Sequence, residues 1–182
     1  MSNARPAAGD AGIIRRANDR QPLPFDPIEE AARLWSQRSG ETPRMRAVTS
    51  LMRVHQLVLT ELDELLRPLG LTFARYEVLV LLSFSRRGAL PLGKIGERLQ
   101  VHATSVTPLV RRLERAGLIR RTPHPEDGRA VLASITPQGR AVLEQATDAI
   151  VAAQFALSAL SEDDCEQLTA LLTPPRKAAG DF

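Results

Sequence analysis

The sequence lacks several features that define large classes of proteins. A single cysteine among 182 residues excludes a disulfide within the chain. The three histidines, His55, His102 and His124, stand on separate segments without the spacing of metal ligands, and the chain has no glycine-rich phosphate loop. No nucleophile-and-base pattern points to catalysis either. We therefore expect a protein that is not an enzyme and that uses no metal and no cofactor.

Long apolar runs are missing as well. The amino-terminal MSNARPAAGDAGIIRR contains no continuous apolar segment of the kind found in signal peptides. No run elsewhere approaches the length needed to cross a bilayer. The sequence therefore predicts a cytoplasmic protein that does not enter the membrane.

Positive charge is concentrated in one third of the chain. Residues 72–130 contain 11 Lys or Arg against 5 Asp or Glu, a net charge of +6, whereas the whole chain carries +3. A local excess of this kind is the electrostatic footprint expected of a surface that binds phosphate groups.

A helix expected within this basic segment has two different faces. In HATSVTPLVRRLERAGLI, apolar residues recur at helical spacing from Val106 to Leu113, which predicts an inward face. The opposite face carries small hydroxyls and then arginines, and such a face taken alone is as compatible with simple solvation as with binding. Together with a shorter helix at 93–100, this face supplies the candidate DNA-binding residues Lys94, Thr104, Ser105, Thr107, Arg111 and Arg112.

The residues after this helix favour binding over solvation. Gly117 provides a helix stop, and two short β-prone runs flank the turn-rich PHPEDG. This pattern predicts a β-hairpin whose polar tip places Arg129 at the minor groove of DNA, with Asp127 orienting its guanidinium group. His124 would lie near phosphate or solvent. A helix in the major groove and a hairpin in the minor groove would read both grooves.

This order of elements resembles the multiple-antibiotic-resistance-regulator (MarR) family of bacterial transcription factors. The resemblance rests on HATSVTPLVRRLERAGL followed by LIRRTPHPEDGRAVLASITPQGR, and it extends from about Pro43 to Leu172. It implies a mainly α fold with a small β-wing, in which a winged helix-turn-helix lobe is joined to a helical dimerisation region. It also implies a homodimer that binds a near-palindromic site on double-stranded DNA, most often as a ligand-responsive repressor.

Two residues depart from the usual family pattern at the start of the DNA-binding helix. His102 stands where a serine commonly caps it, and Pro108 lies inside it. Because proline has no N–H and its ring crowds the preceding turn, we expect the helix to begin at Thr104.

The flanking segments complete the predicted organisation. A long helix from Pro43 to Arg67 is apolar on more than one face, so both its own lobe and a partner subunit would have to cover it. A second long helix is expected from Pro137 to about Leu160, and a last helix would end at Pro174-Pro175. The predicted regions are a disordered arm at 1–26, an extra N-terminal helix at 27–40, a helical dimerisation region at 43–69 and 137–175, and a winged helix-turn-helix DNA-binding domain at 71–136.

The extra N-terminal helix is similar to that of the family's urate-responsive subgroup. The resemblance places Trp35, the Tyr76-Glu77 pair and Arg121 at an effector site, which implies a small aromatic or anionic effector. Pro108 occupies the place of a second arginine, so an anion would lack one of its cations. Residues at helical spacing such as Met52, His55, Phe73 and Tyr76 are more often plain core than part of a pocket. The candidate ligand-binding residues are Trp35, Met52, His55, Phe73, Tyr76, Glu77 and Arg121.

Other functions remain open from the sequence alone. A winged helix can dock proteins, and a DNA-binding protein of this kind can also act constitutively without an effector. The peroxide-sensing branch of the family uses a reactive cysteine, but the acidic neighbours of Cys165 disfavour a thiolate and favour a structural thiol.

Overall fold

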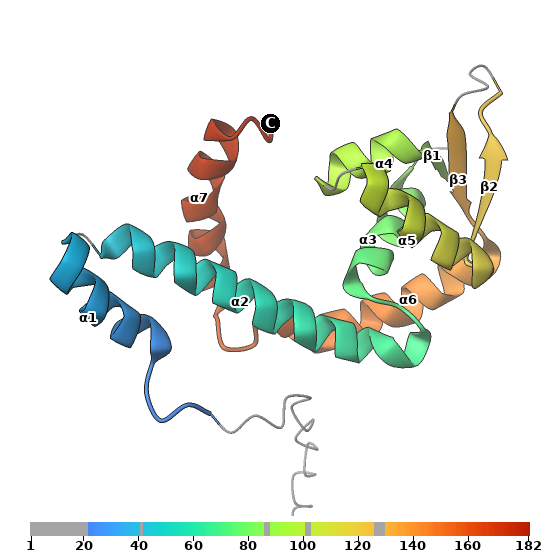
Figure 1. Cartoon of the computed structure of the whole chain (residues 1–182). Helices are drawn as coiled ribbons and strands as arrows, with labels where there is room; N and C mark the ends of the chain where they lie inside the picture. Colours follow the sequence, from blue (N-terminus) through green and yellow to red (C-terminus); the bar gives the residue numbers. More distant parts are fainter. Residues whose placement is uncertain (1–21, 41, 86–87, 101–102, 126–129) are drawn as a thin grey trace, which may run out of the picture. The chain divides into compact units, whose positions relative to one another are not determined.

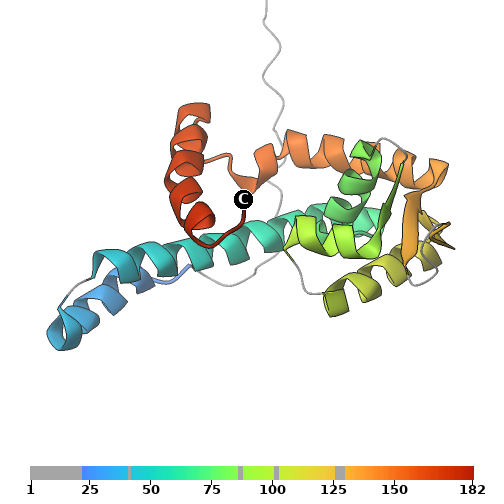
Figure 2. The same ribbon diagram turned by 90° about the horizontal axis from the view of Figure 1, so that it is seen from above.

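The structure is a computed structural model that describes residues 22–40, 42–85, 88–100, 103–125 and 130–182. The chain forms two compact units, Met1–Thr49 and Ser50–Phe182 (Figures 1 and 2). Most of the arm expected at 1–26 lies outside the described residues. In the part of the chain that is described, no helix combines the length and the apolar character needed to span a membrane.

The first unit contains the extra N-terminal helix α1 (Pro27–Ser39). Its start is fixed by Asp26, whose carboxylate accepts a hydrogen bond from the Ile28 backbone N–H at 2.8 Å. Gly40 follows the helix with φ of 77°, a left-handed value that glycine adopts without a steric penalty. The sequence predicted this helix within one residue.

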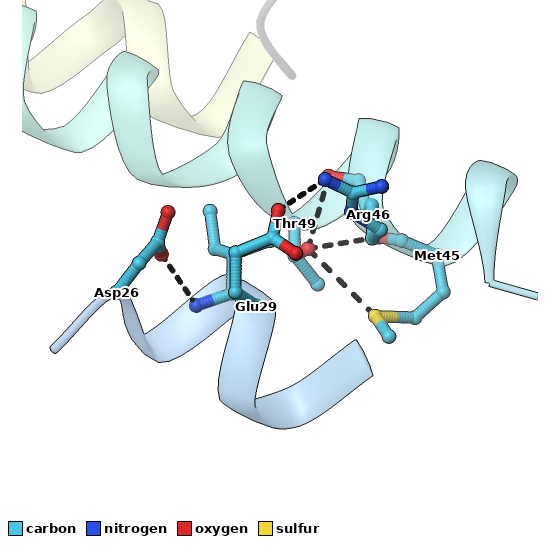
Figure 3. Close-up of polar contacts among 6 residues, drawn as sticks. Asp26, Glu29, Met45, Arg46 and Thr49 are labelled. Carbon is cyan, nitrogen blue, oxygen red and sulfur yellow. Dashed lines mark hydrogen bonds and ion pairs between the residues drawn. The ribbon is translucent and has the colours of Figure 1, made fainter. Parts of the chain in front are cut away.

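Side chains join α1 to the first turns of α2 (Pro43–Leu66). Glu29 of α1 forms an ion pair with Arg46 of α2, and within α2 the Thr49 hydroxyl donates to the Met45 backbone carbonyl at 2.8 Å (Figure 3). These contacts are exposed, so each contributes only modestly to stability.

The second unit contains a three-stranded antiparallel sheet of β1 (Ala89–Pro91), β2 (Ile119–Pro123) and β3 (Val131–Ile135) in the order β1-β3-β2. The predicted hairpin is present as β2 and β3, with Ile119 opposite Ile135. The sequence did not predict β1, because three residues are too few to show the alternation of a strand.

Helices pack around this sheet to form the lobe and its core. Helix α3 contacts α5, α6 and β3, and α4 contacts α5 (Figure 1). Val106, Val110 and Leu113 of α5 are at most 1% exposed, which confirms the predicted inward face. The remaining bounds are η1 (Arg67–Leu69), α3 (Phe73–Phe84), α4 (Leu92–Leu99), α5 (Ala103–Arg115) and α6 (Pro137–Ala152). The mainly helical fold with a small sheet agrees with the fold class predicted from the sequence.

The helix predicted from Pro137 to Leu160 is shorter than expected. Helix α6 ends at Ala152, and the turn η2 (Gln154–Ala156) follows, with φ values of 49°, 54° and 60° at its three residues. No glycine marks this left-handed turn, so the local sequence gives no sign of it. Ala156 packs against the core, and this tertiary contact holds the turn.

The last helix, α7 (Glu162–Ala178), begins as predicted but ends later. Ser161 and Asp164 form the expected capping box. The helix continues through Pro174 and Pro175, which was not predicted. Beyond them, the Ala179 N–H donates to the Pro175 carbonyl at 3.0 Å, and Arg176 pairs with Asp181 at 2.6 Å. These bonds close the last turn after the two prolines.

Replacing Gln154 with glycine is expected to raise the free energy of unfolding by about 0.5–1 kcal/mol. The exposed Gln154 has a left-handed conformation that costs an L-residue roughly 1–2 kcal/mol, which exceeds the roughly 0.5–1 kcal/mol entropic cost of glycine. Urea unfolding measures the change. As a control, Gln145→Gly within α6 should lower stability by about 1 kcal/mol. Destabilisation by both variants would contradict a left-handed turn.

Candidate nucleic-acid interface

The outer face of α5 carries most of the candidate DNA-binding residues. Ser105, Arg111 and Arg112 are exposed, and Thr107 is half-buried at the edge of this face. Their side chains lie opposite the buried face that anchors α5 in the lobe. Burial of one face therefore fixes the position of α5 in the lobe and leaves the hydroxyl and arginine side chains of the other face directed outward.

The other candidate residues lie on α4 and the hairpin. Lys94 of α4 is exposed and forms an ion pair with Glu97 at 2.7 Å. The His124 backbone N–H donates to the Ala130 carbonyl at 2.9 Å, which closes the hairpin beyond β2 and β3. Asp127 and Arg129, at the predicted tip, lie outside the described residues, and so does the Thr104 side chain.

Helix α5 contains Pro108 and begins at Ala103, one residue before the expected start at Thr104. Pro108 is thus the sixth residue of the helix, where it cannot donate to the Thr104 carbonyl. The proline is exposed, so water can reach this part of the helix backbone. His102 lies outside the described residues.

One acidic residue on α5 was missed by the sequence analysis. Glu114 accepts a hydrogen bond from Arg121 Nε of β2 at 2.6 Å, and Glu114 Oε2 also lies 2.6 Å from Arg121 Nη2 in an ion pair. Glu114 and Arg121 are seven residues apart, but α5 ends between them, so helical periodicity does not relate their side chains. No local pattern therefore indicated this pair.

A close backbone contact joins the base of the hairpin to α6. The Thr136 hydroxyl donates to the Gly117 carbonyl at 2.8 Å and accepts from the Gly139 N–H at 3.0 Å. The Thr136 N–H donates to the Leu118 carbonyl at 3.0 Å. Gly139 permits this approach, because a Cβ atom there would lie 2.0 Å from the Leu118 carbonyl oxygen. The end of α5, the hairpin and the start of α6 therefore form one rigid joint.

Two of the candidate ligand-binding residues take part in the core of the lobe. Tyr76 is 7% exposed, and its hydroxyl lies 3.3 Å from that of Thr147 on α6. The Phe73 and Tyr76 rings stack with their centroids 5.8 Å apart. Glu77 is half-buried on the same helix, and burial raises the pKa of its carboxyl group.

The remaining candidate ligand-binding residues are differently placed. Met52 and His55 are exposed on α2, Trp35 is 48% exposed on α1, and Arg121 is bound to Glu114. Two grooves in the described part of the second unit have volumes of about 440 and 370 Å³, and none of the seven candidates lines either one. They are formed along α7, from Cys165 to Thr173, and at the α2–α3 junction, from Asp63 to Arg75.

Known proteins are similar to this chain, and the similarity includes the basic segment. A model described as the MarR family matches residues 71–131. The chain is 37% identical over 108 residues to the organic hydroperoxide resistance transcriptional regulator of Bacillus subtilis, covering 59% of this chain and 71% of that protein. It is 31% identical over 132 residues to the transcriptional repressor MdtR of the same organism, covering 71% and 83%.

Solved structures share the fold. Sco5413, a MarR family transcriptional regulator from Streptomyces coelicolor, is 52% identical with a TM-score of 0.74, and the match covers 78% of this chain and 99% of that one. The transcriptional regulator MOSR from M. tuberculosis, solved in complex with DNA, is 25% identical with a TM-score of 0.63, and the match covers 74% and 96%.

Proposed function

Because the chain belongs to the MarR family of transcriptional regulators, we propose that it binds a near-palindromic DNA operator as a homodimer and releases it on binding a small effector. The main support for DNA binding is the composition of the outer face of α5. That face holds hydroxyls and arginines in a row, opposite a fully buried face, within the segment of net charge +6. The relative solved with DNA has the same fold and supports this role.

Each part of the interface has a distinct role in this proposal. Helix α5 enters the major groove, where arginine can bind guanine and short hydroxyl side chains allow close approach to base edges. Lys94 of α4 and His124 of the hairpin contact phosphate groups, which fix the position of the protein without reading sequence. Arg129 enters the minor groove with Asp127 beside it. The residues on α5 are Thr104, Ser105, Thr107, Arg111 and Arg112.

Exposed apolar side chains on the helices outside the lobe support a homodimer. Leu51, Met52, Val54 and Leu57 of α2 are 42–56% exposed, and Leu171 of α7 is 74% exposed. None of the described residues of α7 is buried. Large apolar side chains exposed together on α2 and α7 favour a cover, and a second copy of the same chain supplies a self-complementary one. A twofold dimer presents two α5 helices about 34 Å apart, which matches a near-palindromic site.

The proposed DNA binding is tested with duplex DNA from the region upstream of this protein's own gene. We expect a specific complex whose affinity falls roughly 10³–10⁵-fold between about 50 and 200 mM salt, as for a protein that contacts about 6–10 phosphates. Fluorescence anisotropy with a labelled duplex measures this. A scrambled duplex of equal length is the control. Equal affinity for both duplexes, or no binding at moderate salt, would overturn the proposal.

Trp35→Ala is expected to reduce release of the operator by an aromatic anion without changing operator affinity in its absence. The half-exposed indole offers stacking surface to a planar ligand, and urate is the probe suggested by the resemblance of the N-terminal helix. Anisotropy titrations with and without urate measure both quantities. The neighbouring Leu34, which is 49% exposed, gives the matched control Leu34→Ala. Equal losses of operator affinity and of release would show that Trp35 only packs.

A further inference from the structure

The Glu114–Arg121 pair directly connects α5 to the hairpin. Glu114 lies in the last turn of α5, and Arg121 is the third residue of β2. One carboxylate oxygen, Glu114 Oε2, accepts a hydrogen bond from Arg121 Nε at 2.6 Å and lies 2.6 Å from Nη2 of the same guanidinium in an ion pair. Because a planar guanidinium held at two of its nitrogens cannot rotate freely, the contact fixes direction as well as distance.

This pair is less exposed than the neighbouring ion pair on α4. The Arg121 and Glu114 side chains are 30% and 34% exposed, whereas those of Lys94 and Glu97 are 59% and 64% exposed. Reduced contact with water weakens screening by salt, so we expect salt to weaken this pair less than the pair on α4.

The sheet register explains why Arg121 reaches α5. Arg121 lies opposite Ala133 of β3, which is fully buried, and two residues after Ile119, which is 2% exposed. Alternate residues of a strand face the same side, so Arg121 shares the inward side of β2 with Ile119. The guanidinium is thus directed at the lobe, while Arg120 between them is exposed.

The charge of Glu114 is unusual in its surroundings. From Arg98 to Pro125 the sequence contains six arginines and one acidic residue, Glu114. A carboxylate on the DNA-binding helix repels phosphate groups, so its presence does not favour DNA binding by attraction. Its contact with Arg121 instead indicates a role in holding the hairpin against α5.

We propose that Glu114 and Arg121 are positioning residues, which hold the hairpin at the angle to α5 that lets the two elements enter adjacent grooves of DNA together. The role rests on the DNA-binding function proposed above. Neither residue needs to touch a base. Loss of the pair lets the part of the hairpin beyond the joint at Gly117 and Thr136 move relative to α5, so the correct site loses the advantage of simultaneous contact in both grooves.

The substitution Glu114→Gln separates this role from a simple effect of charge. If charge alone mattered, removing a negative group would strengthen binding to operator and scrambled DNA equally. With a positioning role, binding to scrambled DNA strengthens while the ratio of operator to scrambled affinity falls about 10-fold, the size expected for one lost charged hydrogen bond. Glu97→Gln, which removes the same charge from the exposed pair, is the matched control and should leave the ratio unchanged.

The reversed pair, Glu114→Arg with Arg121→Glu, completes the experiment because it preserves the net charge. Wild type, the single variants and the reversed pair are compared by anisotropy on both duplexes, with urea unfolding to verify folding. We expect the reversed pair to recover the affinity ratio to within about 3-fold of wild type, since the pair contact itself is restored. An unchanged ratio in Glu114→Gln would overturn the positioning role, and so would a folded reversed pair without recovery. Failure of wild type to distinguish the duplexes would instead overturn the proposed DNA-binding function.

Discussion

Replacing Gly139 with alanine is expected to lower the free energy of unfolding by about 3 kcal/mol, the upper part of the usual range for overpacking. The new Cβ atom would lie 2.0 Å from the Leu118 carbonyl oxygen and 2.9 Å from Ile135 Cγ1. The nearer atom belongs to the backbone, so the start of α6 must move away from the hairpin. That movement also breaks the bond from the Thr136 N–H to Leu118. Differential scanning calorimetry should show a fall in Tm of roughly 6–12 °C.

Gly93 provides the control, because alanine at this position should change the free energy of unfolding in the opposite direction. It lies in α4, and nothing lies within 4 Å of the position that its Cβ would occupy. Gly93→Ala should therefore stabilise the protein by up to about 1 kcal/mol through helix propensity. An increase in Tm for both variants would show that the approach of α6 to Leu118 is not close in solution.

Leu57→Glu is expected to dissociate the dimer and to weaken operator binding by roughly 10²-fold or more, because linked binding of two half-sites is lost. Leu57 is 56% exposed on α2, within the apolar surface that we assign to the partner subunit. An unpaired carboxylate in such an interface costs several kcal/mol of desolvation, roughly as for other buried charges. Sedimentation velocity measures the mass, and anisotropy measures the operator affinity.

The adjacent Gln56 gives a variant of the same charge at a different place on α2. Gln56 lies about 100° round the helix from Leu57, so Gln56→Glu adds a carboxylate on a different side of α2 from Leu57. This variant should remain dimeric and bind the operator as wild type does. If Leu57→Glu stays dimeric at micromolar concentration, this part of α2 does not belong to the dimer interface.

Features that depend on residues close together in the chain could be predicted from the amino-acid sequence. The inward face of α5 follows from apolar residues three and four apart, and burial of Val106, Val110 and Leu113 confirms it. The caps at Asp26 and Ser161 follow from side chains that reach a backbone N–H within a few residues. The β2–β3 hairpin follows from two β-prone runs on either side of a breaker cluster.

Tertiary structure alone decided the features that depend on distant parts of the chain. The left-handed turn at Gln154–Ala156 is unfavourable locally and is held because Ala156 packs on the core. The short strand β1 exists because β3 supplies its partner. Glu114 and Arg121 meet because a helix end, a turn and a strand bring them together, whereas the sequence shows only two charged residues seven positions apart. Each of these contacts depends on packing between elements, and the periodicity of any single element contains no information about its neighbours.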